Sequence, residues 1–300
     1  MVINIYTHDD EYSRKKKEVS AIAIRIFTDS TCDLSHEDQA RLDIIVVPLT
    51  VHFKDVSYLD GLEITNEQFY DMLDSYEELP TTSQVPPQMF VDAFKKCLDS
   101  GDDVIGIFIS SEISGTYNSA CIAKEILLSE RLHIVDSRSA TMSLALLLWE
   151  AAKHRDAGFS ATQIVEHVTM LTKKIRFLAA VNTLKYLRKG GRVSATTAVM
   201  GELLGMKPIV SMINGSVHSV GKARGMPAAL KTILHKALDD LPDLRYSVVF
   251  AHSCASELLG TAVEYLKEPL KLGDWMACSI GSIIGTYAGR GAVGLAYIAL

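Results

Sequence analysis

The sequence predicts an α/β protein of two domains, the first built on a mostly parallel sheet and the second of mixed α+β structure. The chain has 300 residues, and at roughly 100–200 residues per domain this length favours two domains. The first half alternates short β-branched apolar runs with stretches of helical periodicity, which is typical of βαβ units around a parallel sheet. The second half contains Asn214-Gly215, a turn that joins antiparallel strands.

The first domain is expected to span residues 23–175, after an N-terminal extension of residues 1–22. Its predicted strands are Ile24–Thr28, Ile44–Val51, Val104–Ile109 and Leu132–Val135. Helices are predicted between the strands and after the last, at Glu67–Asp74, Pro87–Leu98, Tyr117–Leu128, Ala140–Arg155 and Ala161–Lys174. The extension carries the basic run Arg14–Lys17 and is expected to be a tail, with an early strand added to a sheet edge as the alternative; transient contact with a membrane surface is also compatible with the basic run.

The second domain is expected to span residues 176–300. It begins with a strand-like run, Phe177–Val181, and an Ala-rich helical piece follows Arg192. The hairpin turn at Asn214-Gly215 is flanked by two strand-like runs, Val210–Ile213 and Val217–Val220. Further strands are predicted at Tyr246–Ala251, Met276–Ile280 and Val293–Leu300.

Composition and charge narrow the class of protein. The formal net charge of −6 argues against nucleic acid as a partner, because there is no basic surplus to displace counterions. No apolar run reaches the ~18 residues that a membrane span needs. The start of the chain does not resemble a secretory signal, because Met1–Tyr6 is short and runs into the acidic Asp9-Asp10-Glu11. The five cysteines are scattered without a C-x-x-C pair, which is typical of reduced thiols and offers no zinc site. We therefore expect a cytoplasmic protein.

The histidines are expected to lie on surface helices or loops, without a ligand pair at metal spacing. This expectation covers His8, His36, His154, His167 and His235. No metal and no cofactor are predicted. The segment Gly289–Gly294 matches G-x-G-x-x-G, but the chain ends too soon after it for the helix and acidic residue of a dinucleotide site.

Hydroxyl side chains form clusters in the first domain, at Asp29–Asp33, Thr81–Gln84, Ser110–Thr116 and Asp136–Ser139. Three of the clusters follow predicted strands, and ligands of open α/β sheets bind beyond the carboxyl ends of the strands. Such residues also cap helices, so position alone leaves both interpretations open. If a ligand binds, hydroxyls at helix N-termini favour an anion. The absence of Lys and Arg from Thr81–Gln84 and Ser110–Tyr117 favours a weakly charged head group over a polyphosphate.

A catalytic alternative uses the same region. Ser114, His252 and Asp136 are the residue types of a hydrolytic triad, and a hydrolase or phosphotransferase would use Ser114 and His252. Nothing in their spacing requires such a triad, and no G-x-S-x-G elbow is present.

A series of short motifs runs through the chain in a fixed order. The series is Asp29–Leu34, Pro48-Leu49, Asp60-Gly61, Thr82–Gln84, Ser114–Ala120, Val135–Ser137, Leu187–Arg192 and Lys207–Ile209, with Arg224 opening a later helix. From about residue 23 to its end the chain therefore resembles the DegV family, which includes the fatty-acid-binding subunits of bacterial fatty acid kinase.

The resemblance implies a two-domain fold with a ligand tunnel between and within the domains. A long-chain fatty acid would lie in this tunnel, and a separate kinase subunit would phosphorylate its carboxylate, so the chain would be a carrier, expected to be monomeric, and no enzyme. The residues implied for the carboxylate are Thr82, Ser83, Ser114, Gly115, Thr116 and Tyr287. Arg192, Arg224 and Arg290 are candidates for the rim, facing the head group or the partner.

The chain departs from the family near its C-terminus. Fatty-acid carriers usually have histidine in a G-T-H-x-G-P-G segment, whereas Tyr287 and Arg290 stand at the histidine and proline positions here. A tyrosine hydroxyl donates a hydrogen bond to a carboxylate but has no charge change near neutral pH. This departure leaves open a DegV-like carrier of another amphiphile.

Overall fold

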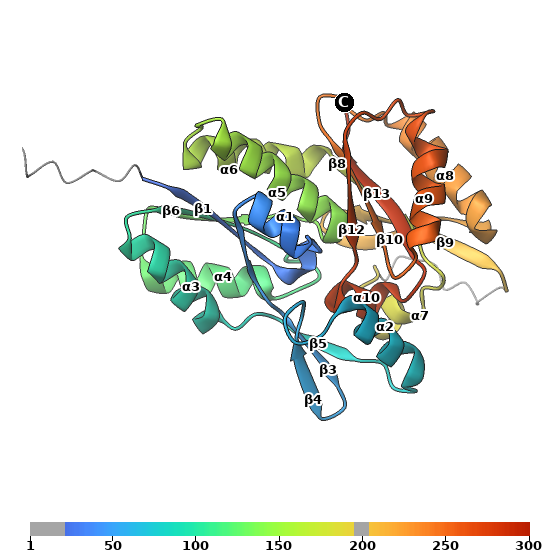
Figure 1. The fold of residues 1–300 in the computed structure, drawn as a ribbon, viewed down its shortest axis with the longest axis horizontal. Coiled ribbons are helices and arrows are strands. Elements are labelled where there is room, and N and C mark those ends of the chain that lie inside the picture. The colour runs from blue at the N-terminus through green and yellow to red at the C-terminus, as the bar shows by residue number, and fades with distance from the viewer. Residues whose placement is uncertain (1–21, 195–203) are drawn as a thin grey trace, which may run out of the picture.

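The fold is known from a computed structural model that describes residues 22–194 and 204–300. Two sheets lie side by side, with helices between them and on their outer faces (Figure 1). The basic run of the N-terminal extension and most of the Ala-rich helical piece expected after Arg192 lie outside the described residues. None of the described helices is both long and apolar enough to cross a bilayer.

The first sheet is fully parallel, as predicted, with the strand order β2-β1-β6-β7. Its strands are β1 (Ile24–Asp29), β2 (Ile44–Val47), β6 (Asp103–Phe108) and β7 (Leu132–Asp136). Helices cover both faces, with α3 (Pro87–Asp99) and α4 (Thr116–Leu127) on one and α5 (Thr141–Asp156) and α6 (Ala161–Lys174) on the other. Side chains alternate between these faces, so that Ile26 packs toward α5 and Phe27 toward α3.

The second sheet is mixed, with the strand order β10-β9-β8-β13-β11-β12. Its strands are β8 (Ile175–Ala180), β9 (Met206–Ile213), β10 (Ser216–Arg224), β11 (Val248–His252), β12 (Trp275–Ser279) and β13 (Val293–Ile298). Strands β11 and β12 are parallel, and the other neighbours are antiparallel. Asn214 and Gly215 have φ angles of 51° and 85°, which a tight hairpin turn of this sequence requires.

Helix α5 fills the space between the two sheets. Its side chains are buried on nearly all sides, and they share one core with β1 and β6 of the first sheet and β11 and β13 of the second. Helices α8 (Gly225–Asp239) and α9 (Ser256–Lys267) pack on the outer face of the second sheet around a separate apolar core. A helix that is apolar all round is typical of such a central position.

One predicted strand is wrong. The run Ile44–Val51 is divided into β2 and β3 (Thr50–Phe53), which belong to different sheets. The division falls at Pro48, which has no N–H to donate to a continuous ladder. Strand β3 pairs instead with β4 (Val56–Leu59) and β5 (Thr81–Ser83) in a small antiparallel sheet. The hydroxyl cluster that starts at Thr81 therefore lies mainly on a strand of this small sheet.

Shorter helices complete the described chain. They are the 3₁₀ turn η2 (Ser30–Cys32), α1 (His36–Arg41), α2 (Asn66–Ser75), α7 (Lys185–Lys189) and α10 (Ser282–Ala288). Helix α10 lies against η2, α2, α7 and two strands of the small sheet, so the C-terminal part of the chain contacts the N-terminal part here.

The expectation of surface histidines is wrong at two positions. His154 of α5 and His167 of α6 are half-buried, and their rings stack with centroids 3.8 Å apart. Sequence spacing did not reveal this pair because the two residues come from different helices. His36 and His235 are exposed, and His8 lies outside the described residues.

Candidate functional site

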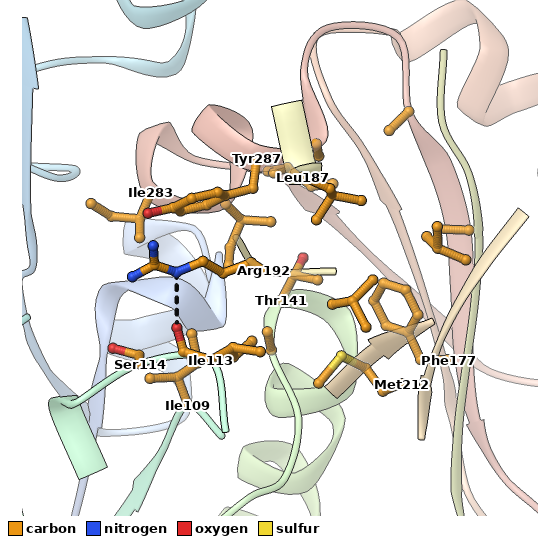
Figure 2. Close-up of a pocket in the computed structure, with 18 of the residues that line it drawn as sticks. Ile109, Ile113, Ser114, Thr141, Phe177, Leu187, Arg192, Met212, Ile283 and Tyr287 are labelled. Atoms are coloured by element: carbon orange, nitrogen blue, oxygen red, sulfur yellow. Dashed lines mark hydrogen bonds between the residues drawn. The ribbon is translucent and has the colours of Figure 1, made fainter. Parts of the chain in front are cut away.

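A cavity of about 350 Å³ lies between the small sheet, the loop after β6 and the second sheet. Its walls come from segments far apart in sequence, namely β5, the loop before α4, the first turn of α5, strands β8 to β10, helix α10 and β13. Most of its lining side chains are apolar, and polar groups gather at one end. In Figure 2, Ser114, Arg192 and Tyr287 lie toward this end, and Phe177 and Met212 lie at the opposite end.

The polar end brings together residues that the sequence placed in separate motifs. Thr82, Ser83, Ser114, Gly115 and Tyr287 all line the cavity. The hydroxyl groups of Thr82 and Tyr287 are 2.7 Å apart and share a hydrogen bond, which joins the small sheet to α10. Hydroxyls that bond to each other can turn to donate to an incoming acceptor. This end of the cavity is therefore suited to an oxygen-rich head group.

Local packing fixes the loop that carries Ser114. The amide of Ile109, where β6 ends, donates to the buried carboxylate of Asp29 at 2.8 Å, and the hydroxyl of Ser110 donates to the carbonyl of Gly215 at 2.8 Å. Gly115 has no side chain, and a Cβ atom here would lie 1.9 Å from the Gln84 side chain. Helix α4 begins at the next residue, so the start of this helix lies beside the polar end of the cavity, and the amide of Thr116 donates to the Ser114 hydroxyl at 3.2 Å.

Arg192 brings a positive charge to the polar end. Its guanidinium lies 5.1 Å from the centre of the Tyr287 ring and donates to the carbonyl of Ile113 at 3.4 Å (Figure 2). It also donates to the carbonyl of Gly190 at 2.6 Å. A Cβ atom at Gly190 would lie 2.4 Å from that same ring, so glycine permits the approach. The loops around Ser114 and Thr82 lack basic residues, and the charge comes instead from the second half of the chain.

The comparisons with known proteins agree on one family. The profile of the family described as "Uncharacterised protein, DegV family" matches residues 23–300. A DegV domain-containing protein of Clostridium acetobutylicum is 34% identical over 275 residues, which cover 92% of this chain and 98% of that protein. The chain belongs to the DegV family. A second DegV domain-containing relative, from Caldanaerobacter subterraneus, is 34% identical over 273 residues, or 91% of this chain and 97% of its own length.

Solved DegV structures share the fold over nearly the whole chain. A DegV family protein from Thermus thermophilus, described for its fatty acid binding, has a TM-score of 0.86 at 27% identity and covers 93% of this chain and 100% of its own. DegV from Bacillus subtilis, a fatty acid binding protein, has a TM-score of 0.80 at 28% identity with the same coverage. A stearic acid-binding protein from Eubacterium ventriosum has a TM-score of 0.83 at 26% identity, covering 92% of this chain and 98% of its own.

Three residues expected at the site lie outside the cavity lining of this DegV-family protein. Thr116 is buried below Ser114, whose hydroxyl lies 3.0 Å from the Thr116 hydroxyl, so Thr116 orients Ser114. Arg224 is exposed at the start of α8. Arg290 forms ion pairs with Asp71 and Asp74 of α2 at 3.0 and 2.7 Å. These two arginines therefore do not contribute to the polar end.

The triad of the catalytic alternative is not assembled in the described structure. The Ser114 hydroxyl bonds to Thr116, and Nδ1 of His252 accepts from the amide of Ala255 at 3.0 Å. The Asp136 carboxylate accepts from Ser111 and from the amide of Arg138. His252 does not line the cavity that contains Ser114. We therefore set this alternative aside.

Sequence reasoning missed several residues of the cavity. Gln84 lines it and donates to Ser119 at 2.8 Å, and the motif Thr82–Gln84 already contained this residue. Thr141 lines it from the first turn of α5. The only indication of this in the sequence is that Thr141 closely follows the hydroxyl cluster Asp136–Ser139. The apolar wall, which includes Phe177, Met212 and Ile283, has the same composition as an ordinary core.

Two buried carboxylates hold α10 against the N-terminal part of the chain. Asp33 accepts from the amide of Gly281 at 2.9 Å, and Asp60 accepts from the amide and hydroxyl of Ser282 at 3.0 and 2.6 Å. We call these four residues the carboxylate clasp. Burial raises the pKa of both carboxyl groups, that of Asp33 well above its usual range. Because α10 carries Tyr287, the clasp also positions the polar end of the cavity.

The stability of the protein is expected to decrease with rising pH because of Asp29. Burial raises the pKa of this carboxyl to about 6 from an ordinary value of 3.8, although hydrogen bonds from Thr31 and Ile109 oppose the shift. The folded chain therefore retains a proton that the unfolded chain releases at lower pH. The resulting stabilisation is fully present below about pH 4 and is lost as the pH rises through about 6.

Between pH 5 and 7 the free energy of unfolding should fall by about 1 kcal/mol because of Asp29 alone. Denaturant unfolding across this range checks the expectation, with Asp29→Asn as the variant whose profile lacks this contribution. Parallel profiles for the two chains would contradict the raised pKa.

Proposed function

We propose that this DegV-family protein binds one long-chain fatty acid in the cavity, with its carboxylate at the polar end. The observation that supports this is the division of a single cavity into a hydroxyl- and arginine-bearing end and an apolar wall. An amphiphile with one compact acidic head group matches both parts. The fatty acids described for related DegV proteins support the same assignment.

The energetics of this proposal are favourable. Burying a chain of about 14 methylenes contributes roughly 11 kcal/mol before the cost of ordering the ligand. The carboxylate would accept hydrogen bonds from Ser114, Thr82 and Tyr287, and Arg192 would offset its charge. A buried carboxylate without such donors is costly, so the polar end also fixes the direction in which the ligand lies.

We further propose that the chain is a cytoplasmic carrier which presents the carboxylate to a separate fatty acid kinase subunit. The exposed side chain of Arg192 at the polar end supports this, because a phosphate donor would approach the carboxylate from there. Arg224 and Arg290 remain candidates for the partner surface, and the carrier is proposed to act as a monomer. A mixture of a fatty acid kinase subunit, ATP and loaded carrier should form acyl phosphate, and omission of the carrier should abolish it.

The first test is mass spectrometry of the purified protein, in its native state and after extraction with organic solvent. One fatty acid per chain is the expected result. A bound molecule that is not an acid would favour the carrier of another amphiphile, and Tyr287, which lines the polar end, would be the first residue to substitute. A protein free of any lipid, and unable to take up added fatty acid, would contradict the proposal.

A Ser114→Ala variant should bind fatty acid roughly tenfold more weakly, because it loses one hydrogen bond to a charged group worth about 1.5 kcal/mol. Ser111→Ala is the matched control, since Ser111 lies in the same loop but bonds to Asp136 and does not line the cavity. Titration with a fluorescent fatty acid measures both. Equal affinity of the Ser114 variant and the wild type would refute the head-group assignment.

A further inference from the structure

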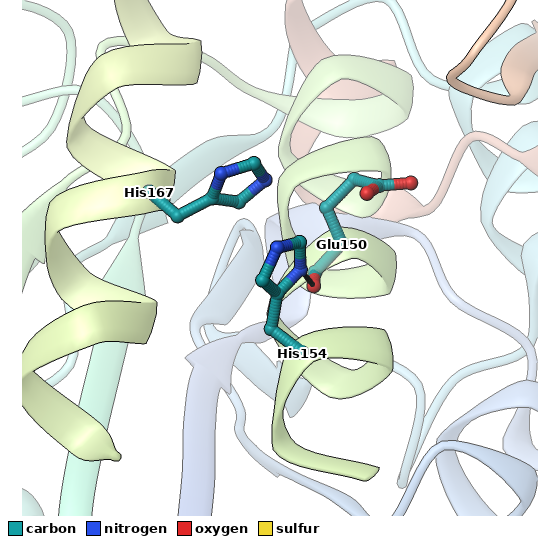
Figure 3. A group of neighbouring side chains, drawn as sticks. All are labelled: Glu150, His154 and His167. Atoms are coloured by element: carbon teal, nitrogen blue, oxygen red, sulfur yellow. Dashed lines mark hydrogen bonds between the residues drawn. The ribbon is translucent and has the colours of Figure 1, made fainter. Parts of the chain in front are cut away.

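A second group of potential ligand atoms lies away from the cavity, between α5 and α6. Glu150 and His154 are four residues apart on α5, so they share one face of that helix, and His167 projects toward them from α6 (Figure 3). One ligand atom from each side chain lies within 4.8 Å of the other two. This group is formed by packing of two helices, which explains why sequence spacing gave no indication of it.

Two polar atoms of this group are buried without a hydrogen-bond partner among the described residues. They are Oε1 of Glu150, whose side chain is 1% exposed, and Nε2 of His167. The cation of Lys153 is 3.9 Å from the carboxylate, which is too far for a hydrogen bond. A buried carboxylate and a buried ring nitrogen without partners each cost free energy. Because the Glu150 oxygen and the His167 nitrogen belong to the same group, one bound ion could satisfy both atoms.

The tautomer of His154 leaves its other nitrogen free to bind a metal. Nδ1 of His154 lies 2.9 Å from the carbonyl oxygen of Glu150, and a carbonyl only accepts, so Nδ1 carries the proton (Figure 3). In the neutral ring, Nε2 therefore holds a lone pair. A histidine that binds metal through one nitrogen commonly donates its other N–H to such an acceptor, which fixes the ring.

We propose that Glu150, His154 and His167 bind a divalent transition-metal ion of the zinc class and thereby join α5 to α6. Two imidazoles and one carboxylate form a donor set that Zn²⁺ accepts, with a water as the fourth ligand. At distances of about 2.1 Å to the ion, tetrahedral ligand atoms are about 3.4 Å apart, so side-chain rotations must close a gap of at most about 1.4 Å from the present separations, which are within 4.8 Å. On metal binding, the stacked rings of His154 and His167 would tilt so that a nitrogen of each ring faces the ion. Lys153, whose side chain is 57% exposed, turns into solvent.

The test is zinc binding by the full chain without an affinity tag, measured by titration against a chromophoric chelator. Wild type should bind one ion per chain at this site, and His154→Ala and His167→Ala should weaken binding at least about 100-fold. His235→Ala is the matched control, because His235 is an exposed helix residue outside the group. Equal zinc affinity and stoichiometry in wild type and the His167 variant would overturn the proposal.

Two further measurements keep the test decisive. Glu150→Gln preserves the shape of the buried side chain, so it separates loss of a ligand from loss of the fold, and zinc should raise the Tm of the wild type but not of this variant. Cobalt substitution separates this site from the free cysteines. Thiolate-to-metal charge-transfer bands would assign the ion to cysteine and overturn the proposal, whereas a spectrum without them is expected.

Discussion

A Met212→Trp variant is expected to bind long-chain fatty acids about 50-fold more weakly than the wild type and to prefer shorter acids. Met212 lies at the end of the cavity opposite Ser114 and Tyr287, where the proposed acyl tail ends (Figure 2). An indole here displaces about three methylenes of the ligand, and each buried methylene contributes about 0.8 kcal/mol. The resulting loss is roughly 2.4 kcal/mol, while the polar end remains intact.

The matched control is Ile213→Trp. Ile213 is the next residue of β9, it is 43% exposed, and it does not line the cavity. Competition between acids of different length against one fluorescent acid measures both affinity and preference. If the Met212 and Ile213 variants keep the same length preference as the wild type, the tail does not lie at Met212. The Met212 and Ser114 variants therefore test the two ends of the ligand separately, because Ser114→Ala affects the head-group end and Met212→Trp the tail end.

The framework of the fold could be predicted from the sequence because its pattern is local. Short β-branched runs such as Val104–Ile109 alternate with amphipathic helices, and Asn214-Gly215 marks its hairpin by backbone requirements alone. The prediction of one strand at Ile44–Val51 was wrong, because the chain on either side of Pro48 forms strands of two different sheets. A proline within an apolar run of that length indicates that the run does not form one continuous strand.

The candidate site was only partly predictable because its parts meet through tertiary packing. The motifs identified Thr82, Ser114 and Tyr287, but not that the Thr82 and Tyr287 hydroxyls lie 2.7 Å apart. Apolar residues such as Phe177 give no sequence signal that separates cavity wall from core, since both are apolar strand positions.

The buried polar groups outside the cavity were misjudged for the same reason. The sequence placed Asp33 in a cluster after the first strand, yet its carboxylate accepts from the amide of Gly281, 248 residues away. His154 and His167 were assigned to the surface, yet they stack between two helices. In both cases the polar atom is explained by a partner distant in sequence, which local patterns do not encode.

Loss of the carboxylate clasp should have the largest effect on stability. Asp60→Ala is expected to lower the free energy of unfolding by about 4 kcal/mol, because it leaves the buried amide and hydroxyl of Ser282 without their acceptor and creates a cavity. Asp60 is 5% exposed, so water does not readily replace it. Denaturant unfolding measures the loss, and Asp55→Ala, an exposed acidic residue in the turn between β3 and β4, serves as the control.

Asp60→Asn distinguishes hydrogen bonding from charge at the same position. The amide oxygen still accepts from Ser282, so this variant should recover about half of the stability that Asp60→Ala loses. Because Ser282 begins the helix that carries Tyr287, Asp60→Ala should also weaken fatty-acid binding in the chains that remain folded, and Asp60→Asn should restore much of the affinity. Full stability in Asp60→Ala would mean that the packing of α10 against α2 and the small sheet holds the helix without the clasp.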